Sequence, residues 1–113
     1  MPDFIFEPVA GKNKPYVESL RHLLGQFRNP FGAGEHVGIK LHWGERGNKG
    51  FLPPDYAREI VSWIAARGAK PFIFDTTVLY SGGRRTAEDS LNTAAAHGYT
   101  PDFLGCPLVI ADG

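Results

Sequence analysis

The sequence is poor in cysteine, carries no net charge and contains no long apolar run. Its single cysteine, Cys106, cannot form an intramolecular disulfide, nor can it supply alone the thiolates of a structural zinc site or an iron–sulfur cluster. Twelve basic residues balance twelve acidic ones, so no overall positive field attracts nucleic acid or anionic lipid. No apolar segment reaches the roughly 18 residues of a membrane span, and the start lacks the segments of a signal peptide. These absences predict a cytoplasmic protein that binds neither nucleic acid nor membranes.

The residues that are present predict one folded domain. Hydrophobic residues make up 42% of the chain and charged residues 21%, which is typical of globular proteins and far from the disordered class. A chain of 113 residues supports a single core of modest size. We therefore expect residues 1–113 to form a single α/β domain.

Short β-branched or aromatic runs alternate with segments of helical periodicity. Strands are expected at 3–7, 36–41, 70–75 and 108–111, and helices near 16–27, 53–68 and 86–98. This βαβαβαβ order predicts an open, mainly parallel four-stranded sheet of Rossmann-like, three-layer type. The apolar run Phe72-Ile73-Phe74 is typical of a central strand.

The sequence stops at the end of the last expected strand, where a loop and a helix normally follow. A parallel sheet also needs cover on both faces, and three helices are few for that purpose. The pattern predicts the N-terminal fragment of a longer architecture, incomplete at its C terminus. The alternative is a module whose sheet is covered by another copy of the chain or by a partner subunit.

Polar residues gather where the expected strands end, which is where open parallel sheets bind ligands. Lys40 lies beside the apolar Ile39 and Leu41, and a lysine in such a position needs an anionic partner. That partner is either a carboxylate at a neighbouring strand end, Asp75 or Asp112, or a bound phosphate or carboxylate. Both interpretations fit the sequence.

A second loop approaches the helix expected from residue 86. Arg84 and Arg85 follow two glycines there, and guanidinium groups beside free backbone N–H groups can hold phosphate or carboxylate. The same residues also fit a glycine turn with solvated arginines. Tyr80 has two interpretations. Its ring could stack against a ligand, or its hydroxyl could donate to one; alternatively it is a side chain of the core.

A metal site is the weaker interpretation of the same sheet edge. His42, Glu45, Asp75 and Asp112 offer the mixed nitrogen and oxygen donors that suit a divalent cation. They lack short ligand spacing, however, and Lys40 would repel a cation. We therefore assign no metal ligands.

Four motifs at these positions resemble the amino-terminal part of a known family, the uncharacterised iron–sulfur centre proteins of domain-of-unknown-function family three-six-two. The motifs are Ile39-Lys40-Leu41-His42-Trp43-Gly44-Glu45, Phe74-Asp75-Thr76-Thr77, Ala95-Ala96-His97-Gly98-Tyr99 and Ile110-Ala111-Asp112-Gly113. The resemblance runs from about Val37 to Gly113. It implies a larger α/β protein with a later cysteine-rich segment for a four-iron four-sulfur cluster, and that segment is absent from this sequence.

Two functions fit these observations. In the first, the strand ends bind an anionic small molecule, with His42 as acid or base and Asp75 orienting it. The expected ligand-binding residues are Lys40, Glu45, Thr76, Tyr80, Arg84, Arg85 and Asp112. In the second, the chain is a non-catalytic scaffold that docks a cluster-bearing segment or a partner subunit. Whether the chain is an enzyme therefore stays open at the level of sequence.

Overall fold

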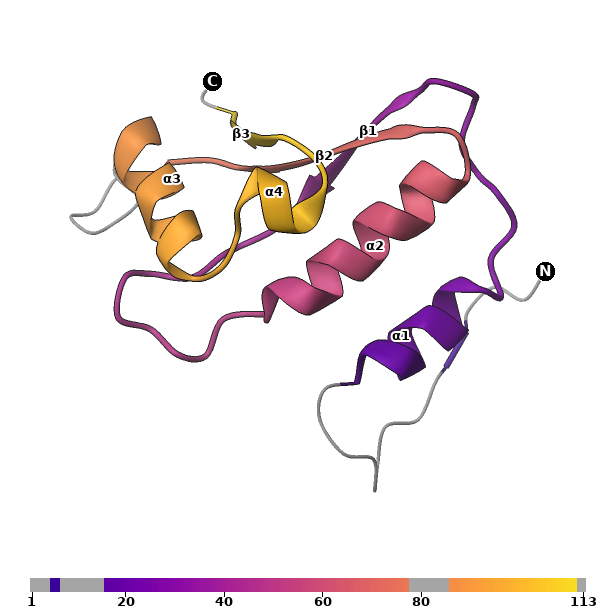
Figure 1. Ribbon diagram of the computed structural model, residues 1–113, viewed down its shortest axis with the longest axis horizontal. Helices are drawn as coiled ribbons and strands as arrows, with labels where there is room; N and C mark the ends of the chain where they lie inside the picture. Colours follow the sequence, from indigo (N-terminus) through magenta and orange to yellow (C-terminus); the bar gives the residue numbers. More distant parts are fainter. Residues whose placement is uncertain (1–4, 7–15, 78–85, 112–113) are drawn as a thin grey trace.

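The fold is a small parallel sheet with helices packed against it. The computed structural model describes residues 5–6, 16–77 and 86–111 (Figure 1). Its elements are α1 (Val17–Leu24), β1 (His36–Lys40), α2 (Pro54–Ala66), β2 (Lys70–Asp75), α3 (Ala87–Ala96), α4 (Pro101–Leu104) and β3 (Leu108–Ile110). The strands are parallel and lie in the order β1-β2-β3. No helix in these ranges has the length and apolar character to cross a membrane.

The open parallel sheet and the α/β class agree with the sequence prediction, and β2 is the central strand. The predicted four-stranded, three-layer arrangement is not confirmed, because the sheet of the described residues has three strands. The strand expected at 3–7 lies mostly outside those residues. Its two described members, Ile5 and Phe6, are not in a strand, and Phe6 is 75% exposed.

Local sequence signals explain most element boundaries. Pro54 is the first residue of α2, where proline needs no hydrogen-bond partner for its nitrogen. The Thr86 hydroxyl accepts a hydrogen bond from the Asp89 amide and caps α3. Thr100 caps α4 in the same way, from the Phe103 amide. The sequence prediction missed α4 although this Thr-Pro signal was present.

The core lies between the sheet and α2, α3 and α4. Alternating residues of the strands point toward these helices, and Ile73 of β2 is completely buried among them. Ala57 and Val61 of α2 pack on the same cluster as Trp43 and Tyr99. Helix α1 packs against α2 and not against the sheet.

All the helices lie on one side of the sheet (Figure 1). The physical reason is the strand order: right-handed crossovers from β1 to β2 and then from β2 to β3 place each connecting helix on the same face. The opposite face, whose exposed residues include Lys40 and Val109, carries no helix among the described residues. The three-layer prediction is not confirmed, because the order of the described strands does not reverse.

Candidate functional site

Lys40 and Asp75 meet at the carboxyl edge of the sheet, where the sequence placed a ligand site. Each is the last residue of its strand, β1 and β2 respectively. The Lys40 Nζ donates to Asp75 Oδ1 over 2.7 Å. Of the two partners proposed for Lys40, a strand-end carboxylate or a bound anion, the structure contains the carboxylate.

The two partners of this ion pair differ sharply in exposure. The Asp75 side chain is 3% exposed and the Lys40 side chain 55% exposed. The Thr76 amide also donates to Asp75 Oδ1, over 2.9 Å, which fixes the carboxylate. The ammonium has three donor hydrogens, so its exposed part can still donate to an anion in solvent. A buried carboxylate thus holds an accessible cation at the strand ends.

His42 lies two residues after Lys40 and is exposed. Its Nδ1 accepts a hydrogen bond from the Gly44 amide over 3.0 Å. An imidazole that accepts at Nδ1 carries its proton at Nε2 when neutral. His42 therefore presents an Nε2–H hydrogen-bond donor, which suits contact with an anion.

The segment between β1 and α2 is held by the turn that follows α3. His97 Nδ1 donates to the Trp43 carbonyl over 2.7 Å, and the Tyr99 hydroxyl donates to the Leu52 carbonyl. The Phe51 ring stacks on His97, with centroids 4.0 Å apart and planes 10° from parallel. The loop that leaves Lys40 is thus fixed at both of its ends.

Sequence analysis assigns no role to His97 and so misses this contact with the loop. The available signal was the motif Ala95-Ala96-His97-Gly98-Tyr99, which the resemblance included. The motif acts through the fold: Gly98 turns the chain with a φ of +87°, so that His97 and Tyr99 both face the loop.

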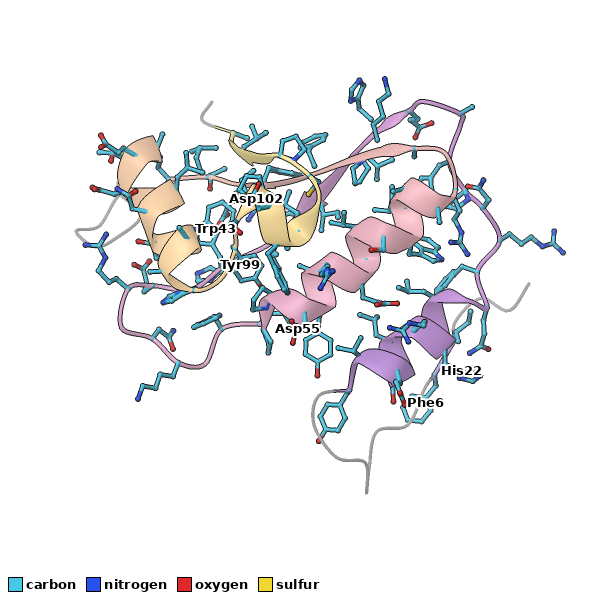
Figure 2. The ribbon with its side chains drawn as sticks, viewed as in Figure 1. Phe6, His22, Trp43, Asp55, Tyr99 and Asp102 are labelled. Carbon is cyan, nitrogen blue, oxygen red and sulfur yellow. The ribbon has the colours of Figure 1, made fainter. Side chains whose placement is uncertain are left out.

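Trp43 anchors the beginning of the same loop in the core (Figure 2). The residue is completely buried, and its Nε1 has no hydrogen-bond partner among residues 5–6, 16–77 and 86–111. A buried N–H without a partner weakens the fold, so the indole stabilises through its apolar contact area alone. Trp43 is therefore a packing residue that places the strand-end loop.

The burial of Tyr99 predicts that the stability of the folded chain depends on pH. It has no exposed surface, and burial raises the pKa of its hydroxyl from 10.0 to about 12. Between these values the folded chain keeps a proton that the unfolded chain has lost, so the free energy of unfolding falls as the pH rises. Urea unfolding at about pH 9 and about pH 11 should show this fall in the parent chain. The Tyr99→Phe variant should show a shallower fall, because it lacks the hydroxyl that titrates; an unchanged slope would contradict the assignment.

The remaining predicted residues divide into two groups. Glu45 is half-buried in the loop after β1, and Thr76 is exposed directly after Asp75. The rest lie outside the described residues: Tyr80, Arg84, Arg85 and Asp112. The structure brings together Lys40, Asp75 and Thr76, and it places His42 and Glu45 on the adjoining loop.

The metal alternative gains no support from the part of the chain that the structure covers. Residues 5–6, 16–77 and 86–111 contain no group of three or more His, Cys, Asp or Glu side chains close enough to hold a metal ion. Asp112, one member of the proposed set, lies beyond them. Cys106 is buried, and this burial raises the pKa of its thiol, which disfavours the thiolate that a metal or a substrate would need.

A hollow of about 390 Å³ lies elsewhere, between α1 and α2. Arg21 crosses this region and binds Glu59 through its Nε over 2.7 Å and its Nη2 over 3.2 Å. None of the predicted site residues lines the hollow. The hollow is open and both acidic and basic side chains line it, so its chemistry does not indicate which class of ligand it would bind.

Comparison with known proteins gives one match. A family model described as "Domain of unknown function (DUF362)" matches residues 37–113, which is more than half of the chain. The matched range contains β2, β3, all of β1 except His36, and every predicted site residue. No curated protein and no solved structure matches the chain.

Proposed function

The chain belongs to the DUF362 family, and on that premise we propose that it binds an anionic small molecule at the carboxyl edge of its sheet. The ligand would present a phosphate or carboxylate group to Lys40. One observation carries the proposal: the Lys40 ammonium is fixed by a carboxylate that is 3% exposed, while its own side chain is 55% exposed. A cation that is both positioned and accessible is what an anion site requires.

The surroundings of Lys40 support this function. Ligands of open parallel sheets bind beyond the carboxyl ends of the strands, and Lys40 and Asp75 occupy two such ends. His42 adds a second donor through Nε2. The loop that carries it is fixed by His97 and Tyr99, so little conformational entropy is lost when a ligand binds.

The contacts suggest different roles for the two residues first proposed as catalytic. Asp75 binds Lys40, so positioning the Lys40 ammonium is the role that its geometry supports. For His42, first expected to act as acid or base, the role that its contacts support is hydrogen bonding to the ligand through Nε2. Glu45, Thr76, Tyr80, Arg84, Arg85 and Asp112 stay predictions for the same ligand, because they flank this edge in the sequence.

Titration with inorganic phosphate tests the proposal. Phosphate should shift the backbone amide signals of Lys40, His42 and Thr76 in ¹H–¹⁵N spectra of the whole chain. Lys40→Met should weaken the affinity about tenfold, which corresponds to about 1.4 kcal/mol, because a charge-assisted hydrogen bond is lost. Lys40→Arg, which keeps the charge, should retain most of the affinity.

Lys70 provides the matched control. It is an exposed lysine at the opposite, amino end of β2. Lys70→Met should leave phosphate affinity and the pattern of shifted signals unchanged. Equal weakening by Lys40→Met and Lys70→Met, or shifts spread evenly over the chain, would contradict a site at this edge.

The iron–sulfur association implied by the resemblance needs residues from elsewhere. Cys106 is the single cysteine of the sequence, and it is only 7% exposed. The chain therefore does not fit a four-iron four-sulfur cluster, whose iron atoms bind four thiolates. Any such cluster would belong to another segment or subunit, and the cytoplasmic location stays a prediction from cysteine usage.

A docking role is the second candidate function. The observation that favours it is separate from the anion site: one face of the sheet has no helix among the described residues. The nature of the partner follows from the side chains on that face.

A further inference from the structure

The bare face of the sheet, defined by His36, Gly38, Lys40, Lys70, Phe72, Phe74 and Val109, has a regular arrangement. The register pairs His36 with Lys70, Gly38 with Phe72, and Lys40 with Phe74, which in turn pairs with Val109. Paired residues of parallel strands point to the same side, so these rows share one face. The other face is the one that the helices cover.

The middle of the bare face is apolar. Gly38 has no side chain, and the rings of Phe72 and Phe74 lie over it: a Cβ at Gly38 would be 2.8 Å from one ring and 2.9 Å from the other. The ring centroids are 5.8 Å apart. Val109, next to Phe74, is 40% exposed. Phe72 and Phe74 are half-buried. Apolar side chains that stay partly exposed side by side on a sheet are typical of an interaction surface.

The formally charged residues among the seven that define the bare face are two lysines, Lys70 and Lys40. His36 and Lys70 form the row at the amino end, and Lys40 lies in the row at the carboxyl end. All three residues are exposed. The acid nearest in space to Lys40, Asp75, is buried and belongs to the covered side. Two facing copies of this surface would therefore bring lysines together, which disfavours a second copy as the occupant.

The covered face shows how a helix packs on this sheet. Helix α2 presents Ala57, Val61 and Ile64 at spacings of four and three residues, and all three are buried. Small and branched aliphatic side chains at such spacings form the stripe that fits a twisted sheet. The bare face offers an equivalent apolar strip between cationic rows.

We propose that the bare face is a docking surface for an amphipathic helix of a partner protein, one whose aliphatic stripe is flanked by Asp and Glu. The apolar stripe would cover Phe72, Phe74 and Val109. The acidic flanks would lie beside Lys70 and Lys40. This inference shares Lys40 with the proposed anion site, but Val109 and Lys70, whose variants test it, lie outside that site.

Binding of designed helical peptides tests the proposal. Two labelled peptides share one Leu and Ala stripe and differ in flanks, Glu in one and Lys in the other. In fluorescence anisotropy with the whole chain, the Glu peptide should bind at least about tenfold more tightly, because only its flanks complement the surface. Val109→Glu should weaken that binding about tenfold or more, and Lys70→Glu should remove the preference for the Glu peptide.

Leu91→Glu is the matched control. Leu91 belongs to α3 on the helical side and is 38% exposed, close to the 40% of Val109. It should leave peptide binding unchanged, and circular dichroism should show that all the variants fold. Absence of binding, equal binding of the two peptides, or equal weakening by Leu91→Glu and Val109→Glu would overturn the proposal. So would a dimer of the chain alone, in sedimentation, that Val109→Glu dissociates, since a second copy would then occupy the face.

Discussion

Replacing Gly44 with alanine is expected to lower the free energy of unfolding by about 2 to 4 kcal/mol. Gly44 has a φ of +91°, a conformation that strains any residue with a Cβ. The space is also filled: an added Cβ would lie 2.7 Å from the Phe51 Cβ and 3.0 Å from its Cγ. Because Phe51 is stacked on His97, it cannot move away without breaking that contact.

The neighbouring Gly47 separates strain from crowding. Its φ is +84°, nearly that of Gly44, but an added Cβ would meet nothing within 4 Å. Gly47→Ala should therefore cost only about 1 to 2 kcal/mol, the strain alone. Urea unfolding of both variants measures the difference. Equal losses would show that Phe51 does not pack on Gly44 as described.

Gly44→Ala should also disturb the proposed anion site. The Gly44 amide holds His42, and the same short segment follows Lys40. A displaced loop should shift the amide signals of His42 and Gly44 and weaken phosphate binding. Gly47→Ala should leave those signals in place, so the two variants test whether the loop conformation matters to the site.

Replacing Trp43 with alanine is expected to cost about 3 to 5 kcal/mol. Trp43 has no exposed surface and packs in the cluster with Ile73 and Tyr99. Its removal leaves a cavity where α2, α3 and the sheet meet, and such a loss is a large share of the 5 to 15 kcal/mol by which domains are usually stable. Urea unfolding followed by circular dichroism measures it.

Phenylalanine variants of the two tryptophans give the control. Trp43→Phe removes an N–H that has no partner, so it should lose only packing volume. Trp63 is half-buried, and its Nε1 donates to the Leu24 carbonyl over 3.0 Å, a contact between α2 and α1. Trp63→Phe should therefore lose this bond as well. A Trp43→Ala variant as stable as the parent would contradict the described core.

The sequence predicted the elements whose signals are local. Periodicity and caps located β1, α2, β2, α3 and β3 within a few residues, because each depends on neighbours along the chain. The helix expected at 16–27 ends at Leu24, where the final turn is no longer helical. The apolar run at 71–74 marked the central strand, and the motifs from Val37 onward identified the family.

The candidate site was predicted in part. Lys40 was recognised because a lysine between apolar strand residues requires an anion, and this reasoning needs no coordinates. The choice of Asp75 as that anion needed the register of β1 and β2, which brings together residues 35 positions apart. Sequence spacing alone offered Asp112 equally.

Tertiary structure decided the arrangement of the loop and of the helices. His97 contacts Trp43, which is 54 residues away in the sequence, and Tyr99 contacts Leu52, which is 47 residues away. Neither contact can be predicted from the sequence pattern of a single segment. The described helices lie on one side of the sheet because of the strand order, which apolar periodicity does not encode. The sequence by itself determined the elements, the family and the need of Lys40 for an anion. The tertiary structure decided the partner of Lys40, the fixed loop and the bare face. The physical reason is that packing brings together segments far apart in the chain, and the sequence pattern of one segment does not indicate which other segment it will contact.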